Sequence, residues 1–102
     1  MITETPVIEK KKQAVRSLKE PKKFKVVVCN DDVTTMEFVI LMLVEVFNHS
    51  SEKAIDLTID IHTNGKAVAG TYTYEIAEQK AFEAVELARL NDFPLVVKVE
   101  TE

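Results

Sequence analysis

An apolar run in this chain ends at three polar residues, and the start of a helix follows at once. Residues 24–29 read Phe-Lys-Val-Val-Val-Cys, and residues 30–32 read Asn-Asp-Asp. Thr34 and Glu37 form a Thr-x-x-Glu capping box, which predicts a helix over about residues 35–47. Junctions between rigid elements often hold ligands, and two carboxylates beside an amide oxygen suit a cation or an amine.

A second polar segment supplies a histidine. Residues 59–66 read Ile-Asp-Ile-His-Thr-Asn-Gly-Lys, with His62 near the end of an expected helix. If the two segments met, an apolar concavity beside an acidic, amide-bearing rim would suit a free peptide amino terminus and its first side chain. The ordinary alternatives stay open at this point: turn formation by residues 30–32, helix capping by His62, and plain core packing by the apolar residues.

The middle of the chain predicts a second helix and a second strand. Residues 48–51 (Asn-His-Ser-Ser) break the first helix and offer a serine N-cap, and the new helix runs to about His62. Asn64-Gly65 suits a left-handed C-terminal cap. Residues 66–72 then predict a strand, in which Gly70 would allow close approach of another backbone.

The last third predicts a third helix and a third strand. Thr73 is the expected helix N-cap, and Asn91-Asp92-Phe93-Pro94 is the expected stop. Between them lies a stripe of small residues that would pack closely on a sheet: Ala77, Ala81, Ala84 and Ala88. Residues 95–99, mostly β-branched, predict the final strand.

The element order β-α-α-β-α-β predicts an α+β domain. We expect a small three-stranded antiparallel sheet covered by three helices, over residues 24–102. Residues 1–23 lack aromatic residues and apolar periodicity, and they predict a flexible, disordered N-terminal extension. At 102 residues the chain is expected to form one small domain.

Charge is divided unevenly along the chain. Residues 1–23 hold seven Lys or Arg and three Glu, which gives +4. Residues 24–102 hold six Lys or Arg and fourteen Asp or Glu, which gives −8. The expected domain is therefore acidic, which argues against a nucleic-acid partner. There is no signal-peptide pattern and no apolar run long enough to span a membrane, so we expect a cytoplasmic protein without a membrane partner.

Common catalytic and metal-binding patterns are missing. Residues 30–32 do not fit an EF-hand loop, and Cys29, His49 and His62 lack the paired spacing of a zinc site. Cys29 lies within an apolar run and is expected to be an inert core thiol. We expect no cofactor, and no nucleophile or oxyanion site accompanies Asp31, Asp32 and His62 as it would in a hydrolase.

Four segments resemble one known family. Residues 26–39 (Val-Val-Val-Cys-Asn-Asp-Asp-Val-Thr-Thr-Met-Glu-Phe-Val) and 61–70 (Ile-His-Thr-Asn-Gly-Lys-Ala-Val-Ala-Gly) resemble the two signature segments of ClpS, the bacterial N-end-rule adaptor. Residues 74–80 (Tyr-Glu-Ile-Ala-Glu-Gln-Lys) and 93–95 (Phe-Pro-Leu) match it in order and spacing. The resemblance covers about residues 22–101.

The resemblance implies an adaptor and not an enzyme. Such a protein binds substrates that begin with a bulky hydrophobic residue (Leu, Phe, Tyr or Trp). It delivers them to the N-terminal domain of the unfoldase ClpA or ClpC, and so to the protease ClpP. The N-terminal extension would serve this delivery. A ClpS-like module that modulates a Clp unfoldase without recognising N-terminal residues is the alternative.

The resemblance also implies site residues. The substrate α-amino group would be held by Asn30, Asp31 and His62. The hydrophobic pocket would be shaped or bordered by Asp32, Thr34, Met36, Val39, Thr58, Ile61 and Leu95, with Met36 as a gate against β-branched first residues. Glu75 and Lys80 match the family's unfoldase-docking surface.

This chain departs from the family pattern at three positions. Thr35 stands where many members carry proline, and Val33 stands where an aromatic residue is frequent. Thr58 stands where a second pocket methionine is common, which predicts a wider or wetter pocket on that side. The ranking among first residues, and the exclusion of Ile and Val, would depend on Thr58.

Overall fold

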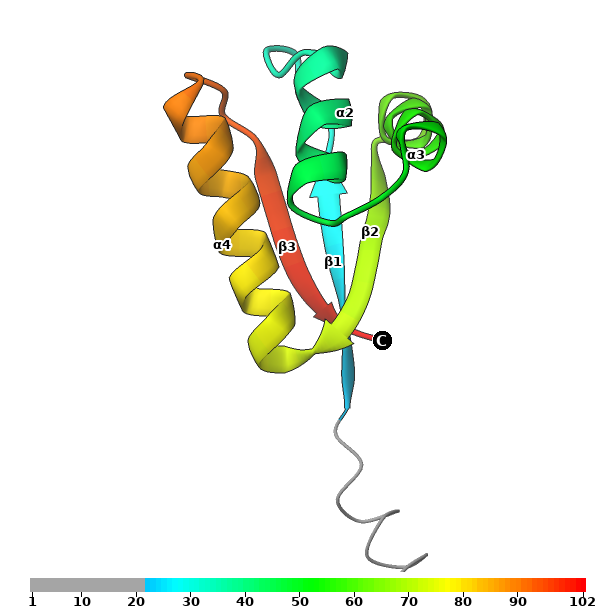
Figure 1. The fold of residues 1–102 in the computed structure, drawn as a ribbon, viewed down its shortest axis with the longest axis vertical. Helices are drawn as coiled ribbons and strands as arrows, with labels where there is room; N and C mark the ends of the chain where they lie inside the picture. Colours follow the sequence, from blue (N-terminus) through cyan, green and yellow to red (C-terminus); the bar gives the residue numbers. More distant parts are fainter. Residues whose placement is uncertain (1–21) are drawn as a thin grey trace, which may run out of the picture.

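A three-stranded antiparallel sheet and three helices form the part of the chain that the computed structural model describes, residues 22–102. The elements follow in the order β1 (Lys23–Cys29), α2 (Met36–Glu45), α3 (Ser51–Asn64), β2 (Lys66–Thr73), α4 (Tyr74–Leu90) and β3 (Val96–Thr101) (Figure 1). The predicted α+β class and element order are confirmed. The flexible extension was predicted for residues 1–23; residues 1–21 lie outside the described residues, and Lys23 is already the first residue of β1, so the predicted boundary is one residue too late.

Strand β1 is the centre of the sheet. The strand order is β2-β1-β3, and both pairs are antiparallel. Because β2 and β3 both pair with β1 as far as Cys29, the two neighbouring strands fix the position of the end of β1, where the polar junction begins. The β1–β2 register shifts between Val26 and Val27, which pair with Gly70 and Val68, so Ala69 is the extra residue of a β-bulge.

The bulge is held by His49, for which the sequence predicted no such contact. His49 Nε2 donates to the Ala69 carbonyl oxygen at 2.5 Å, and its ring stacks on Phe47. Gly70 follows the bulge, and a Cβ built there would collide with the Tyr72 ring. The prediction that Gly70 admits another backbone is therefore wrong, because a neighbouring side chain takes that space.

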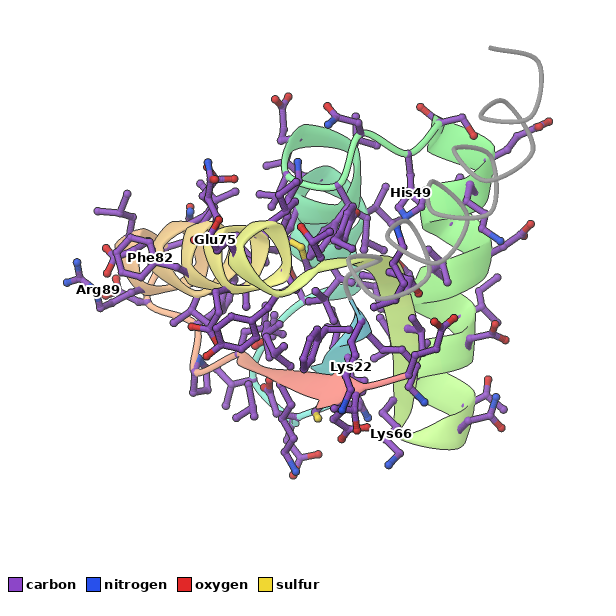
Figure 2. All side chains as sticks on the ribbon, turned by 90° about the horizontal axis from the view of Figure 1, so that it is seen from below. Lys22, His49, Lys66, Glu75, Phe82 and Arg89 are labelled. Carbon is purple, nitrogen blue, oxygen red and sulfur yellow. The ribbon has the colours of Figure 1, made fainter. Side chains whose placement is uncertain are left out.

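The core lies between the sheet and the helices. Val26 and Val28 point from β1 into it and are fully buried, while Val27 points to the opposite face of the sheet. Figures 1 and 2 show α2, α3 and α4 together on one side of the strands. The alanine stripe of α4 does pack against this core, which confirms the prediction: Ala77, Ala84 and Ala88 are buried and Ala81 is partly buried.

The predicted capping box is wrong by one residue. Helix α2 has Thr35 as its N-cap, and the Thr35 hydroxyl accepts from the Phe38 N–H at 3.2 Å. Thr34 cannot serve because its hydroxyl donates to Asp31 Oδ2 at 2.7 Å. Glu37 consequently lies in the first turn, where it complements the helix dipole instead of closing a capping box.

Most other boundaries match the sequence. Ser50 caps α3, accepting from the Lys53 N–H, and Gly65 ends it in the left-handed conformation (φ 89°). Thr73 is the N-cap residue of α4 but makes no side-chain capping bond. Strand β3 begins at Val96, one residue later than predicted, and α2 ends at Glu45, two residues earlier.

Candidate functional site

A hollow opens where β1 ends and α2 begins, beside the C-terminal half of α3. Its volume is about 340 Å³, near the lower end of the range for small-ligand sites. It is lined by the loop after β1, by the first turn of α2 and by one face of α3: Asn30, Asp31, Asp32, Val33, Thr34, Thr35, Met36, Val39, Thr58, Ile61 and His62. We call this hollow the junction pocket. Figure 1 shows its elements at the upper end of the domain.

One backbone hydrogen bond brings the two polar segments together. The Asn30 N–H donates to the Gly65 carbonyl oxygen at 2.9 Å. The end of β1 is thereby tied to the cap of α3, and His62 in the last turn of that helix joins the same rim. Sequence alone cannot show this convergence, because the segments lie about thirty residues apart.

Asp31 organises the loop. Its Oδ1 accepts from the Val33 N–H at 2.8 Å and from the Thr34 N–H at 2.7 Å, and its Oδ2 accepts from the Thr34 hydroxyl. Partial burial raises the pKa of Asp31, but the hydrogen bonds from Thr34 and Val33 outweigh it, so the net pKa lies below the ordinary 3.8. The carboxylate is therefore ionised at neutral pH. Three of its lone-pair positions are used and one on Oδ2 remains open.

The other polar groups of the rim are less committed. Asn30, Asp32 and His62 are exposed, and no group within residues 22–102 donates a hydrogen bond to the Asp32 carboxylate. An amide oxygen, a second carboxylate and an imidazole thus stand at the mouth beside the braced Asp31. Such a set of acceptors can hold a cationic donor group.

The inner wall of the pocket is apolar. Val39 and Ile61 are buried, and Met36 at the start of α2 is 42% exposed, which places it at the mouth. Thr58 is only 2% exposed, and its hydroxyl donates to the Ala54 carbonyl oxygen at 2.7 Å. Because that hydroxyl is satisfied inside α3, it makes little demand for water in the pocket. This hydrogen bond therefore does not support the prediction of a wetter pocket beside Thr58. The prediction of a wider pocket is unaffected, because threonine is smaller than methionine.

The structure gathers nine of the ten residues predicted for amine and pocket contacts around one cavity. The exception is Leu95, which is 6% exposed, belongs to the buried core and does not line the junction pocket. Val33 and Thr35 line it although the sequence reading assigned them no contact. Both lie in the loop between Asp32 and Met36, which were predicted to line the pocket. Their place between two predicted residues could have indicated that they line it too.

The two predicted docking residues lie elsewhere, in the first half of α4. Glu75 is exposed (Figure 2). Lys80 is partly buried, and its Nζ donates to the Val46 carbonyl oxygen at 2.7 Å, which ties α4 to the C-terminal end of α2. Lys80 therefore has a structural partner within the domain.

Two further observations limit the chemistry of the described residues. Residues 22–102 contain no group of three His, Cys, Asp or Glu side chains that could hold a metal ion. No helix in the same range is long and apolar enough to cross a bilayer.

Comparison with known proteins identifies the family. A family model described as ATP-dependent Clp protease adaptor protein ClpS matches residues 19–98. The chain belongs to the ClpS family. Members of this family are adaptor proteins of a Clp protease, so the chain is an adaptor and not an enzyme.

Curated ClpS relatives match over most of their length. The Campylobacter jejuni (strain 81-176) adapter is 48% identical over 85 residues, which cover 83% of this chain and 88% of the relative. The Treponema denticola adapter is 43% identical over 81 residues, covering 79% and 80%. The Acetivibrio thermocellus adapter is 40% identical over 92 residues, covering 90% and 93%.

A solved structure has the same fold. Agrobacterium tumefaciens ClpS2 bound to L-phenylalaninamide is 39% identical to this chain, with a TM-score of 0.78. The match covers 80% of this chain and 99% of ClpS2.

Proposed function

We propose that this ClpS protein binds substrates that begin with Leu, Phe, Tyr or Trp. It then delivers them to a Clp unfoldase, ClpA or ClpC, for degradation by ClpP. The observation that carries the proposal is the junction pocket, in which exposed acidic and amide side chains and buried apolar side chains line the same cavity. A free N-terminal residue has the same two parts, an ammonium group and, for these four residues, a large apolar side chain.

The rim is suited to the ammonium group. An ammonium loses water when it enters a pocket, so it needs several fixed acceptors. Asn30, Asp31 and His62 are the proposed contacts, and Asp31 has one open position on Oδ2. Asp32 is a further acceptor because its carboxylate is otherwise unpaired within residues 22–102. In this proposal Asp31 chiefly holds the loop in shape, and Asp32 adds a freely available negative charge.

The cavity is suited to one side chain. Burying a Leu or Phe side chain contributes about 1.5–3 kcal/mol, which would come from Val39, Ile61 and the methionine at the mouth. Met36 would act as a gate that disfavours β-branched first residues. The L-phenylalaninamide bound by Agrobacterium ClpS2 has a free amino group and an aromatic side chain, which supports the same mode of binding here.

Delivery would use a different surface. We propose that Glu75 contacts the N-terminal domain of the unfoldase, because it is exposed in the first turn of α4. Lys80 would contribute to this docking surface partly by positioning α4, since its ammonium group also bonds the C-terminal end of α2. Delivery would take place in the cytoplasm, the location that the sequence predicts.

Direct binding of short peptides tests the proposal. Fluorescent peptides that differ only in residue one are titrated with the full chain, each beside an N-acetylated copy. We expect Leu- and Phe-initiated peptides to bind, and Ser-initiated and acetylated peptides not to bind. If acetylation changed nothing, the amine contact would be wrong, and the chain would be a docking module that ignores N-terminal residues.

A further inference from the structure

A second hollow lies on the opposite side of the domain from α3, between α4 and the edge of the sheet. Its volume is about 360 Å³, and it is lined by Glu78, Ala81, Phe82 and Val85 of α4 and by Val97 and Val99 of β3. We call it the α4–β3 groove. None of its lining residues belongs to the junction pocket.

The α4 wall of the groove carries apolar side chains that are exposed to solvent, where polar side chains would be usual on a helix surface. Phe82 is 65% exposed and Val85 is 37% exposed. They lie one turn apart, beside the alanine stripe that packs on the core, and Figure 2 shows Phe82 on the side of the domain away from α3. Exposed aromatic residues that line a hollow are typical of a surface that another polypeptide covers.

Strand β3 adds unpaired backbone to this surface. Within residues 22–102, β3 pairs with β1 alone, so the N–H and C=O groups of its outer edge have no strand partner. Val97 and Val99 point toward the groove, while Lys98 and Glu100 point to the other face of the sheet. An added strand would thus place every second side chain against Phe82 and Val85.

We propose that the α4–β3 groove binds an extended segment of a partner polypeptide, which adds to β3 as a fourth strand. Backbone hydrogen bonds to the edge of β3 would hold the segment, and apolar side chains at alternate positions would fill the hollow. This site is independent of the proposed recognition of N-terminal residues.

Charge indicates which segment fits. Glu78 lines the groove and has no ion-pair partner within residues 22–102, and residues 24–102 carry a formal charge of −8. Because side chains alternate along a strand, Lys or Arg between the apolar residues would lie on the side of Lys98 and Glu100, and only a basic residue at an end of the apolar run could reach Glu78. The preference for a basic segment therefore rests mainly on the overall charge of −8. A nucleic acid would be repelled, and a second copy of this chain would bring two Glu78 carboxylates to one interface.

An acetylated peptide is the probe, because acetylation keeps it out of the junction pocket. Ac-Lys-Val-Lys-Leu-Lys-Val-Lys-NH2 is added to the full chain, and amide chemical shifts and hydrogen exchange are followed by NMR. We expect slower exchange and shifted signals in β3 and in α4 around Phe82. A peptide with Glu in place of Lys should bind at least tenfold more weakly, and one with a central proline should lose the protection of β3.

Matched variants distinguish specific binding in the groove from non-specific binding to exposed apolar side chains. Phe82→Arg should weaken peptide binding at least tenfold, and Glu78→Lys should weaken it less. Leu90→Arg is the control, because Leu90 is 73% exposed on the same helix but does not line the groove. Phe82 and Glu78 are exposed, so both variants should fold, and binding of a Leu-initiated peptide should be unchanged in all three.

Three outcomes would overturn the proposal. The first is no change in the exchange of β3 amides at millimolar peptide. The second is an equal loss of binding in Leu90→Arg. The third is protection of the outer β3 amides without added peptide, since the edge would then be covered by residues 1–21 of the same chain or, if dilution abolished the protection, by a second copy.

Discussion

The junction pocket and the α4–β3 groove are of similar volume but differ in how their polar groups are arranged. In the pocket, several acceptors line one small cavity, and Asp31 braces the loop that carries three of them, Asn30, Asp31 and Asp32. In the groove, the polar groups are the regularly spaced backbone of β3 and a single carboxylate, Glu78. The pocket is therefore suited to the end of a chain, and the groove to its middle.

The difference teaches where specificity comes from in such a small domain. A charged amino group is held best by an acceptor that is already in place, and hydrogen bonds from Val33 and Thr34 hold the Asp31 carboxylate in this way. A strand edge accepts almost any extended backbone, so its selectivity depends on side chains such as Phe82. Variants that disturb the Asp31 loop should weaken binding at the junction pocket alone, and variants of Phe82 should weaken binding at the groove alone.

The largest effect is expected for Asp31→Ala. This change removes the acceptor for two backbone N–H groups and the Thr34 hydroxyl, so the loop loses its shape as well as a charge. Binding of a Leu-initiated peptide should weaken by about 2–3 kcal/mol, roughly 30- to 150-fold, by fluorescence anisotropy. Asp60→Ala, an exposed carboxylate on α3 outside the pocket, should bind normally. Equal effects in both would show that only net charge matters.

Asp32→Asn should weaken peptide binding less, and without disturbing the loop. The side chain keeps its size, and no hydrogen bond within residues 22–102 depends on its charge. We expect about tenfold weaker binding, and a shallower dependence of the remaining affinity on salt, because one exposed charge is removed. Unfolding by urea should be unchanged. Wild-type affinity in this variant would show that Asp31 alone supplies the carboxylate.

Thr58→Met tests the shape of the pocket wall. Methionine would fill volume beside Ile61 and is expected to tighten selection against β-branched first residues by several-fold, at a stability cost of about 1–3 kcal/mol for overpacking. Thr58→Val is the matched control, because it removes the hydroxyl and keeps the volume. Unchanged relative affinities for Leu- and Ile-initiated peptides in Thr58→Met would count against this role.

The smallest effect is expected from pH. Because the folded-state pKa of Asp31 lies below its usual 3.8, this carboxylate stabilises the fold above that pH, and the contribution is lost as pH falls through the lowered pKa. The free energy of unfolding should thus decline below about pH 4 slightly more steeply in the wild type than in Asp31→Asn. Urea titrations at pH 7, 4 and 3 measure this difference, and parallel curves would remove Asp31 as a source of acid sensitivity.

Much of the fold could be predicted because local chemistry decides it. The β-α-α-β-α-β order follows from residues that act on their own neighbours, such as the Ser50 cap and the left-handed Gly65. The alanine stripe of α4 also predicted its buried face correctly. Family resemblance and the polar junction together named nine residues that do line one pocket.

Tertiary structure decided what depends on residues far apart in the chain. The choice of Thr35 over Thr34 as the cap is a local exception, because the Thr34 hydroxyl is bonded to Asp31, only three residues away. Leu95 follows a predicted motif, yet packing puts it in the core. The Asn30–Gly65 hydrogen bond and the α4–β3 groove join elements from distant segments. The sequence by itself determined which groups are available, and the long-range contacts of the sheet decided which of them meet, because those contacts depend on register and packing that no local pattern encodes.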